Sequence, residues 1–240
     1  MCIKSFRKLV LMLPLFFVSC VYYANGTVGK GSIVTEQIKS GSFTSIENFS
    51  SAEVQIEKGD SFRVELSDYE NLVDLWDIKV IDNKLVIQTK PFTSLVNTRA
   101  KVHIVMPDQL NKVTVFGSGE VQINSAFENL ESVRINGSGN ITGSADTNFK
   151  LLKINISGSG NVRLKGVSND VQAAIYGSGK IYLSDVKTQN ADCLISGSGD
   201  IYLTVEEKLK VAIYGSGNIY YSGRPVIDVT SSGSGRLISQ

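Results

Sequence analysis

The sequence is poor in the residues that form metal centres and disulfide frameworks. Its 240 residues include one His and three Cys, and no two cysteines form a Cys-x-x-Cys pair. A structural zinc site needs several Cys or His ligands, and the lone imidazole of His103 does not supply them. We therefore expect no metal, no cofactor and no disulfide framework.

Charge of one sign is also scarce. The chain carries 24 Lys and Arg against 23 Asp and Glu, so it lacks the basic surplus that attracts phosphate backbones. A nucleic-acid partner is therefore not expected. Hydrophobic residues make up 42% of the chain, which argues against disorder, and the length is enough for one large all-β domain.

The N-terminus carries a short apolar run. It extends from Leu9 to Val18, ten residues, about half the length that a membrane-spanning helix needs. The basic residues Lys4, Arg7 and Lys8 precede it. A basic segment followed by a short apolar segment is typical of an export signal.

The apolar run ends in Phe17-Val18-Ser19-Cys20, which resembles a bacterial lipoprotein box. That resemblance predicts a signal peptide over residues 1–19, a lipid on the Cys20 thiol and a tether over residues 20–32. The exported protein is then expected in the cell envelope, anchored to the outer membrane through its lipid. Ordinary signal cleavage near Ala24 or Gly26 is the alternative.

The most conspicuous feature is a repeated tripeptide. Gly-Ser-Gly occurs seven times at intervals of 18–21 residues and contains fourteen of the 22 glycines. Apolar residues stand four and two positions before each first Gly, apart from Ser231 in the last unit, and four positions after it. In the first unit these residues are Val113, Val115 and Val121. The motif glycines are Gly117, Gly119, Gly137, Gly139, Gly158, Gly160, Gly177, Gly179, Gly197, Gly199, Gly215, Gly217, Gly233 and Gly235.

This alternation has the period of two that is typical of a β-strand with one buried face, and it excludes a helix. A glycine pair suits a bend at which successive coils approach closely. One bend per 18–21 residues predicts one coil per repeat, whereas a propeller blade needs about 40–45 residues. We therefore predict an all-β fold, a right-handed parallel β-helix or β-solenoid with about seven Gly-Ser-Gly coils over residues 113–240.

Residues 33–112 lack the motif but still show strand-like segments. Asp82-Asn83 separates two of them as a hairpin-like turn. Because no long linker separates this part from the first repeat, we expect it to continue the same core, cap one end of the solenoid and complete a single domain over residues 33–240. The predicted strands run from Ser42 to Phe49, Glu53 to Glu57, Phe62 to Leu66, Ile78 to Ile81, Lys84 to Thr89 and Ala100 to Val105.

Tyrosines recur at fixed positions of the repeat. Tyr182, Tyr202 and Tyr220 each stand five residues after the first Gly of three consecutive motifs, so stacked coils would place them in one outward ladder. Tyr176 and Tyr214, each one residue before a motif, form a second partial row. The rings either cover the sheet by stacking on one another or form an aromatic strip that binds sugar rings.

Other polar residues give no catalytic constellation. The repeated serines would each need a neighbouring base, which one His cannot provide. Cys193 falls in an apolar column and is expected to be a small buried side chain. Two acidic groups are expected in solvated loops. They are Glu206-Glu207 and the trio Asp68, Glu70 and Asp74.

The iterated Gly-Ser-Gly-x-Ile/Val units, with the preceding segments Gly41 to Ile56 and Ala100 to Pro107, resemble the putative auto-transporter adhesin, head GIN domain family of exported bacterial proteins. The resemblance covers roughly residues 33–240. It implies a β-helix-type fold and a location in the cell envelope. The family has no established catalytic residues, so the resemblance indicates a place and a fold rather than a reaction.

Together these features predict a non-enzymatic envelope lipoprotein that presents a repetitive β face to a glycan or an envelope protein. Two alternatives stay open. Polysaccharide lyases and hydrolases also occur on β-helices, and they would require carboxylates gathered on one face. The coil ends could instead pair with other copies, which would give a self-assembling scaffold.

Overall fold

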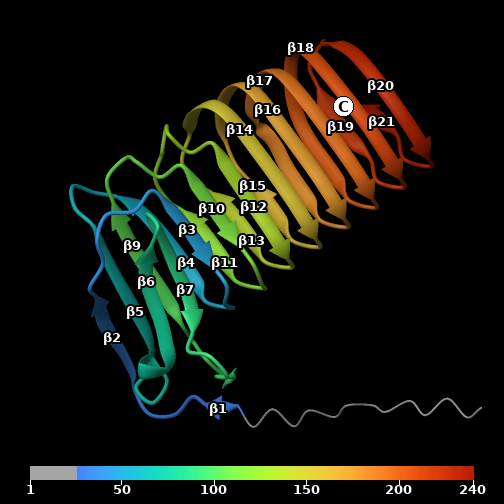
Figure 1. Ribbon diagram of the computed structural model, residues 1–240. Helices are drawn as coiled ribbons and strands as arrows, with labels where there is room; N and C mark the ends of the chain where they lie inside the picture. Colours follow the sequence, from blue (N-terminus) through green and yellow to red (C-terminus); the bar gives the residue numbers. More distant parts are fainter. Residues whose placement is uncertain (1–25) are drawn as a thin grey trace, which may run out of the picture.

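The computed structural model describes residues 26–240 (Figure 1). The predicted signal peptide, Cys20 and the first part of the tether lie outside the described residues. Within residues 26–240 the chain forms strands and a single 3-10 turn, η1 (Val73–Leu75), with no α-helix. No helix in this part of the chain has the length and hydrophobicity to cross a membrane. The all-β prediction is confirmed, and the stacked parallel strands form a solenoid of about six turns.

Each coil of the repeat part bends at its Gly-Ser-Gly motif. Strands that precede the motifs form one flat face, called here the first face, and strands that follow them form the second face. The first face contains β10 (Lys112–Val115), β12 (Ser132–Gly137) and the ends of β14 (Thr147–Gly158), β16 (Gly166–Gly177), β17 (Lys180–Gly197), β18 (Asp200–Gly215) and β20 (Val226–Gly233). The second face contains β11 (Glu120–Ile123), β13 (Asn140–Gly143), β15 (Asn161–Arg163), the beginnings of β17 and β18, β19 (Ile219–Ser222) and β21 (Leu237–Ser239). Between the two faces, β14, β16, β17 and β18 add a short third face.

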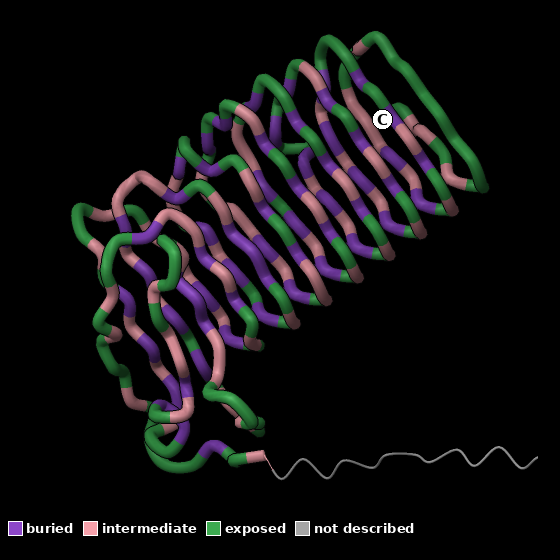
Figure 2. The backbone as a smooth tube through the Cα atoms, viewed as in Figure 1, coloured by how far each residue is buried: buried purple, intermediate pink, exposed green. Residues whose placement is uncertain are grey.

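Equivalent residues of successive coils lie directly over one another, as the repeat predicts. Val113 pairs in register with Val133, and the same column continues through Ile154, to Val211 and Val229. A second column, on the second face, begins at Val121 and ends at Leu237. Their side chains point inward and form one continuous apolar core, visible as the buried stripes of Figure 2. Burial of these ladders is the main driving force for stacking the coils.

Two different constraints select glycine at the bends. The first Gly of six motifs has a φ between 125° and 152°, a region that other residues rarely adopt. The second Gly is required by close approach, because a Cβ on Gly160 would overlap the carbonyl oxygen of Gly139 and lie 2.8 Å from Ile135 Cγ2. Backbone bonds join the bends, with Ser159 N–H donating to Gly137 O at 3.0 Å. The corner is therefore held by the main chain.

The N-terminal part continues the same core by a less regular path. β3 (Ser45–Asn48) and β4 (Glu53–Lys58) pair in parallel with β10 and β11, so they form a coil directly beneath the first repeat. β7 (Lys84–Thr89) and β9 (Lys101–Met106) form the next coil outward, on the other side of β3 and β4. The coil nearest to the repeats in space is therefore not the nearest in sequence.

Antiparallel strands close this end, which confirms the predicted cap. β6 (Trp76–Ile81) pairs with β7 through a turn at Asp82 and Asn83, both with positive φ, as a two-residue hairpin requires. β5 (Arg63–Tyr69) pairs with β9, and β2 (Ile33–Ile38) covers β5 as the outermost strand. Residues 33–38 lack a regular alternation and were not predicted as a strand. A small separate pair joins β1 (Thr27–Val28) to β8 (Leu95–Val96).

The opposite end is open within residues 26–240. All eight residues of β20 are exposed, and this last coil is the longest exposed stretch in Figure 2. Val226 is 76% exposed, and Val229 is 45% exposed although it continues a column that is buried in every earlier coil. Antiparallel strands therefore cover the strand edges at one end of the solenoid, whereas the last coil at the other end is exposed.

Candidate binding surface

The predicted tyrosine ladder forms on the second face. Tyr182, Tyr202 and Tyr220 lie in register on β17, β18 and β19. Each follows an inward-facing isoleucine, such as the buried Ile201 before Tyr202, so the strand alternation turns the tyrosine outward. The ring centroids of Tyr182 and Tyr202 are 5.1 Å apart, and those of Tyr202 and Tyr220 are 4.7 Å apart. The planes deviate by 9° and 5°, so the three rings form a parallel, offset stack.

An arginine that sequence analysis did not assign to a site extends this stack. The guanidinium Cζ of Arg163 lies 4.2 Å from the centroid of the Tyr182 ring, a cation–π contact. Arg163 occupies the tyrosine position of the preceding coil, so the same repeat position could have identified it. We refer to Arg163, Tyr182, Tyr202 and Tyr220 together as the tyrosine ladder.

A polar column runs beside the ladder, two positions earlier on each strand. Lys180 Nζ lies 3.1 Å from a carboxylate oxygen of Asp200, and this hydrogen bond raises the pKa of Lys180. Burial raises the pKa of the Tyr202 phenol above its usual value, and the Asp200 charge adds to that shift. The Tyr202 phenol is therefore neutral at physiological pH. Within residues 26–240 no protein group hydrogen-bonds to the three ladder hydroxyls, so they are available to a ligand or to water.

The second predicted row does not join the ladder. Tyr176 and Tyr214 lie on the first face, across the glycine corner, and are 47% and 49% exposed. Ser196 stands between them in the register, so the two rings are two coils apart and do not stack on each other. The structure therefore brings together three of the five predicted tyrosines and leaves the other two as separate exposed rings.

The expectation of solvated loop charge is wrong for Asp68. This residue lies in β5 and is completely buried. Its carboxylate accepts hydrogen bonds from Trp76 Nε1 at 3.1 Å, Thr98 Oγ1 at 2.6 Å and the backbone N–H groups of Tyr69 and Arg99 at 2.8 and 3.0 Å. Four donors replace its hydration, so the carboxylate organises the cap. The end of β5 and loop residues 98–99 meet only in the folded cap, and the local sequence does not show this contact.

The remaining candidate residues stay apart from one another. Glu206 and Glu207 are exposed on β18 rather than in a loop, far along the chain from the Asp68 group. His103 lies on β9 between Glu57 and Glu65, whose carboxylates are 3.4 and 3.6 Å from its ring nitrogens. No group of three metal-ligating side chains occurs within the described part of the chain.

Cys193 is a buried member of the first-face column, between Ala173 and Val211. Burial, with a smaller contribution from Asp192, raises the pKa of its thiol to about 12. The side chain therefore stays protonated at physiological pH and acts as a small apolar group.

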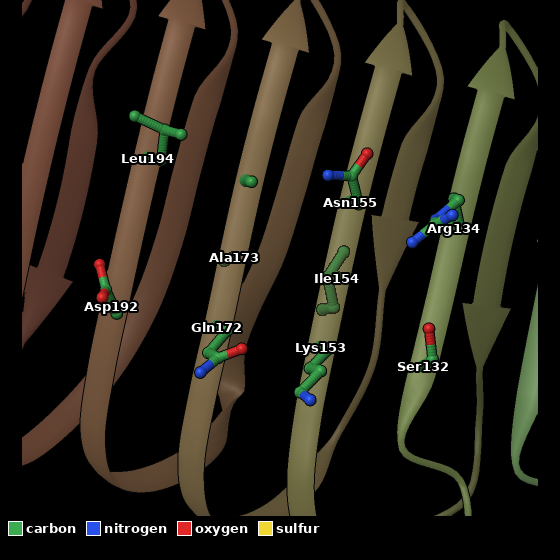
Figure 3. A pocket seen from close by; sticks show the side chains of 10 residues that line it. Ser132, Arg134, Lys153, Ile154, Asn155, Gln172, Ala173, Asp192 and Leu194 are labelled. Carbon is green, nitrogen blue, oxygen red and sulfur yellow. The ribbon is translucent and has the colours of Figure 1, made fainter.

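Sequence analysis missed a shallow hollow on the first face. Its volume is about 420 Å³, and it crosses β12, β14, β16 and β17 (Figure 3). Polar side chains project from these strands, and Ala174 and Leu194 also line the hollow. The polar residues are Ser132, Arg134, Lys153, Asn155, Gln172 and Asp192. Reading the outward positions along the repeat would have aligned them, because each lies three or five residues before a motif.

Several solved structures share this fold. A putative adhesin of Bacteroides fragilis has a TM-score of 0.76 and 23% identity, over 90% of this chain and 100% of that chain. A putative adhesin of Parabacteroides merdae has a TM-score of 0.72 and 22% identity, over 90% and 99%. A putative lipid binding protein of Parabacteroides distasonis has a TM-score of 0.70 and 25% identity, over 89% and 99%. No curated protein matches the chain.

The profile of one protein family covers most of the solenoid. It matches residues 42–225, from the turn before β3 to the loop before β20. This span contains the coil of β3 and β4, the tyrosine ladder and six of the seven Gly-Ser-Gly motifs. The chain therefore belongs to the family described as "Putative auto-transporter adhesin, head GIN domain".

Proposed function

We propose that this protein is an exported, non-enzymatic binding module of the cell envelope, and that the tyrosine ladder contacts a glycan. Its family and several structural relatives are named adhesins. The observation that carries the proposal is the ladder itself, a flat and partly exposed row of aligned rings with free phenolic hydroxyls. Aromatic side chains with polar tips are frequent at recognition surfaces.

The stacking defines how such a ligand would bind. The rings cover much of one another, so they do not offer three separate ring faces. The ladder offers offset ring surface, ring edges and a row of hydroxyls at the spacing of the coils, about 4.8 Å. A sugar chain lying along the solenoid axis can place C–H groups against the rings and hydroxyls against the phenols and Asp200. This mode depends on both the ring and its hydroxyl.

A glycan array with three matched variants tests the proposal. Tyr202→Ala removes the central ring and is expected to abolish binding to the glycans that wild type retains. Tyr202→Phe keeps the stack and loses one hydroxyl, so a partial loss of about tenfold is expected. Tyr176→Ala removes an equally large ring on the first face and should leave binding unchanged. No retained glycan, or equal binding by Tyr202→Ala and wild type, refutes this function.

The membrane anchor is part of the same proposal and has its own test. It rests on the Phe17-Val18-Ser19-Cys20 segment, which resembles a lipoprotein box. The intact mass of the protein from the membrane fraction should exceed that of the chain from Cys20 onward by the mass of the attached lipid. Cys20→Ala should remain unprocessed or soluble. An unmodified mature wild-type chain would contradict lipidation while leaving the glycan test unaffected.

Self-association through the coil ends is a second candidate function. The exposed β20 favours it, because its unpaired edge and apolar side chains can accept another strand. Sedimentation velocity should show concentration-dependent oligomers that Val229→Lys removes. A wild-type monomer at every concentration would exclude this function.

A further inference from the structure

The hollow on the first face has a distinct basic end. Arg134 and Lys153 line this end from β12 and β14, and Lys112 lies one strand beyond the hollow, on β10. Within residues 26–240 none of these three cations has a carboxylate at ion-pair distance, although ten ion pairs form elsewhere in that range. Their partners in register are neutral. Lys112 lies beside Ser45 and Ser132, Arg134 beside Thr114 and Asn155, and Lys153 beside Ser132 and Gln172.

Other lysines of the solenoid do have acidic partners. Three pairs each join residues of one column in adjacent coils: Lys101 with Glu53 at 3.0 Å, Lys180 with Asp200 at 3.1 Å and Lys210 with Asp192 at 3.7 Å. A fourth pair is diagonal, with Lys84 Nζ 3.3 Å from Glu47. Cross-strand neutralisation is thus readily available in this fold. At the basic end of the hollow, by contrast, the residues beside the cations are neutral and can form hydrogen bonds.

The other end of the hollow is acidic. Asp192 lies two coils beyond Lys153 in the same column, and the Gln172 amide lies between them. The Asp192 carboxylate is 56% exposed and meets Lys210 only at 3.7 Å, a weak surface pair. Figure 3 shows Arg134, Lys153, Gln172 and Asp192 on four successive strands, all projecting from the same side of the sheet. Their spacing places Lys153 and Asp192 roughly 10 Å apart along the axis.

The order of these groups selects a class of ligand. Arg134 and Lys153, on adjacent strands, can bind one carboxylate between them through charge-assisted hydrogen bonds. The amides of Asn155 and Gln172 can donate to and accept from hydroxyls, and Asp192 can accept from hydroxyls. A polyanion with a charge on every unit would meet Asp192 unfavourably, whereas a ligand with one carboxylate and several hydroxyls satisfies both ends.

We propose that this hollow binds an acidic oligosaccharide, with Arg134 and Lys153 on its carboxylate and Asn155, Gln172 and Asp192 on its hydroxyls. The site lies on the first face, across the glycine corner from the tyrosine ladder, and does not depend on the ladder's function. Its volume of about 420 Å³ falls within the range of small-molecule sites. Because the hollow is shallow, the expected dissociation constant is about 0.1–1 mM.

Titration calorimetry at low salt tests this site with defined probes. The acidic probe is sialyllactose, which has one carboxylate, and its matched neutral probe is lactose. Trigalacturonate, with a carboxylate on every unit, is the polyanion control. Sialyllactose should bind at least tenfold more tightly than lactose and more tightly than trigalacturonate. Inorganic phosphate distinguishes a saccharide site from a simple anion site, and it should not compete at the same concentration. Equal competition by phosphate, or no binding of sialyllactose, overturns the proposal.

Point variants locate the binding. Arg134→Gln and Lys153→Gln should each weaken the acidic probe about five- to tenfold, and the double variant should abolish its binding. Lys187→Gln removes another exposed lysine outside the hollow and should leave the affinity unchanged. All these side chains lie on the surface, so each variant should fold. Thermal unfolding checks this, because each variant should unfold at nearly the same temperature as wild type. Unchanged affinity in the double variant would place the ligand elsewhere and refute the site.

Discussion

The repeat part and the first N-terminal coil turn the same corner by different means. In the repeats, two glycines let the main chain pass against the coil below, and backbone N–H groups bond to its carbonyls. In the coil of β3 and β4 the corner spans Asn48 to Ala52 and contains no glycine. The buried Asn48 side chain donates to Ala52 O at 3.2 Å and accepts from Ser50 N and Oγ at 3.0 and 2.6 Å.

The comparison shows which part of the corner is essential. From the second repeat onward, each glycine corner fits against the backbone of the glycine corner in the previous coil. The Asn48 corner has no such neighbour below, so a side chain supplies the bonds locally. The Asn48 amide packs against Gly119, because a Cβ on this glycine would be only 2.5 Å from Asn48 Nδ2. The first repeat therefore stacks on a corner made by a side chain, and the later repeats stack on backbone.

The largest effect is expected from filling a repeat corner. Gly160→Val should destabilise the fold by about 4 kcal/mol or more, because its Cβ overlaps the Gly139 carbonyl and neither backbone can move freely. Chemical denaturation followed by circular dichroism measures this loss. Gly41→Val is the matched control, since a Cβ there meets nothing within 4 Å. Similar stability of both variants would show that the corners do not need close approach.

Removing the buried carboxylate of the cap is expected to cost about 3 kcal/mol. Asp68→Ala leaves Trp76 Nε1, Thr98 Oγ1 and two backbone donors without their acceptor. The cap should loosen before the repeats, so hydrogen exchange should rise in β5 and β9 and remain slow in β16 and β17. Asp74→Ala, an exposed acidic neighbour, serves as control. Uniform loss of protection along the chain would mean that cap and repeats unfold as one unit.

Replacing the corner asparagine tests the comparison directly. Asn48→Ala removes three hydrogen bonds in a fully buried setting and should cost about 2 kcal/mol. Asn136 lies next to the second Gly-Ser-Gly motif. Asn136→Ala should change the denaturation midpoint very little, because backbone hydrogen bonds hold that bend. If the two variants lose the same stability, the side chain has no special role in the first corner.

The smallest expected effect concerns the buried thiol in the repeat column. The folded-state pKa of Cys193 is about 12 against a reference of 9.0, so the folded state holds the proton more tightly than the unfolded chain. Its contribution is therefore complete below pH 9 and is lost as pH rises toward 12, and the loss at pH 10 is about 1 kcal/mol. Between pH 8 and pH 10 wild type should lose more stability than Cys193→Ala. A thiol reagent should react with Cys193 only after unfolding, and rapid reaction of the native protein would contradict the burial.

The repeat part was predictable in detail, and the cap only in outline. Seven motifs fixed the register of the columns from Val113 and Val121, and the same spacing aligned Tyr182, Tyr202 and Tyr220. The cap strands were mostly anticipated, but not β2 at residues 33–38, whose side chains are largely exposed and do not alternate. The burial of Asp68 was missed because its donors come from residues up to 31 positions away. The hollow was missed because outward polar residues show no hydrophobic period.

The sequence by itself determined which side chains face inward, where the chain bends and which residues of successive repeats align. These properties follow from alternation along a strand and from the spacing of glycines, which are local and repeated. Only the tertiary structure decided that β3 and β4 insert beneath the first repeat and that Asp68 is enclosed by the cap. Those outcomes depend on contacts between segments far apart in the chain, and no local period encodes such contacts.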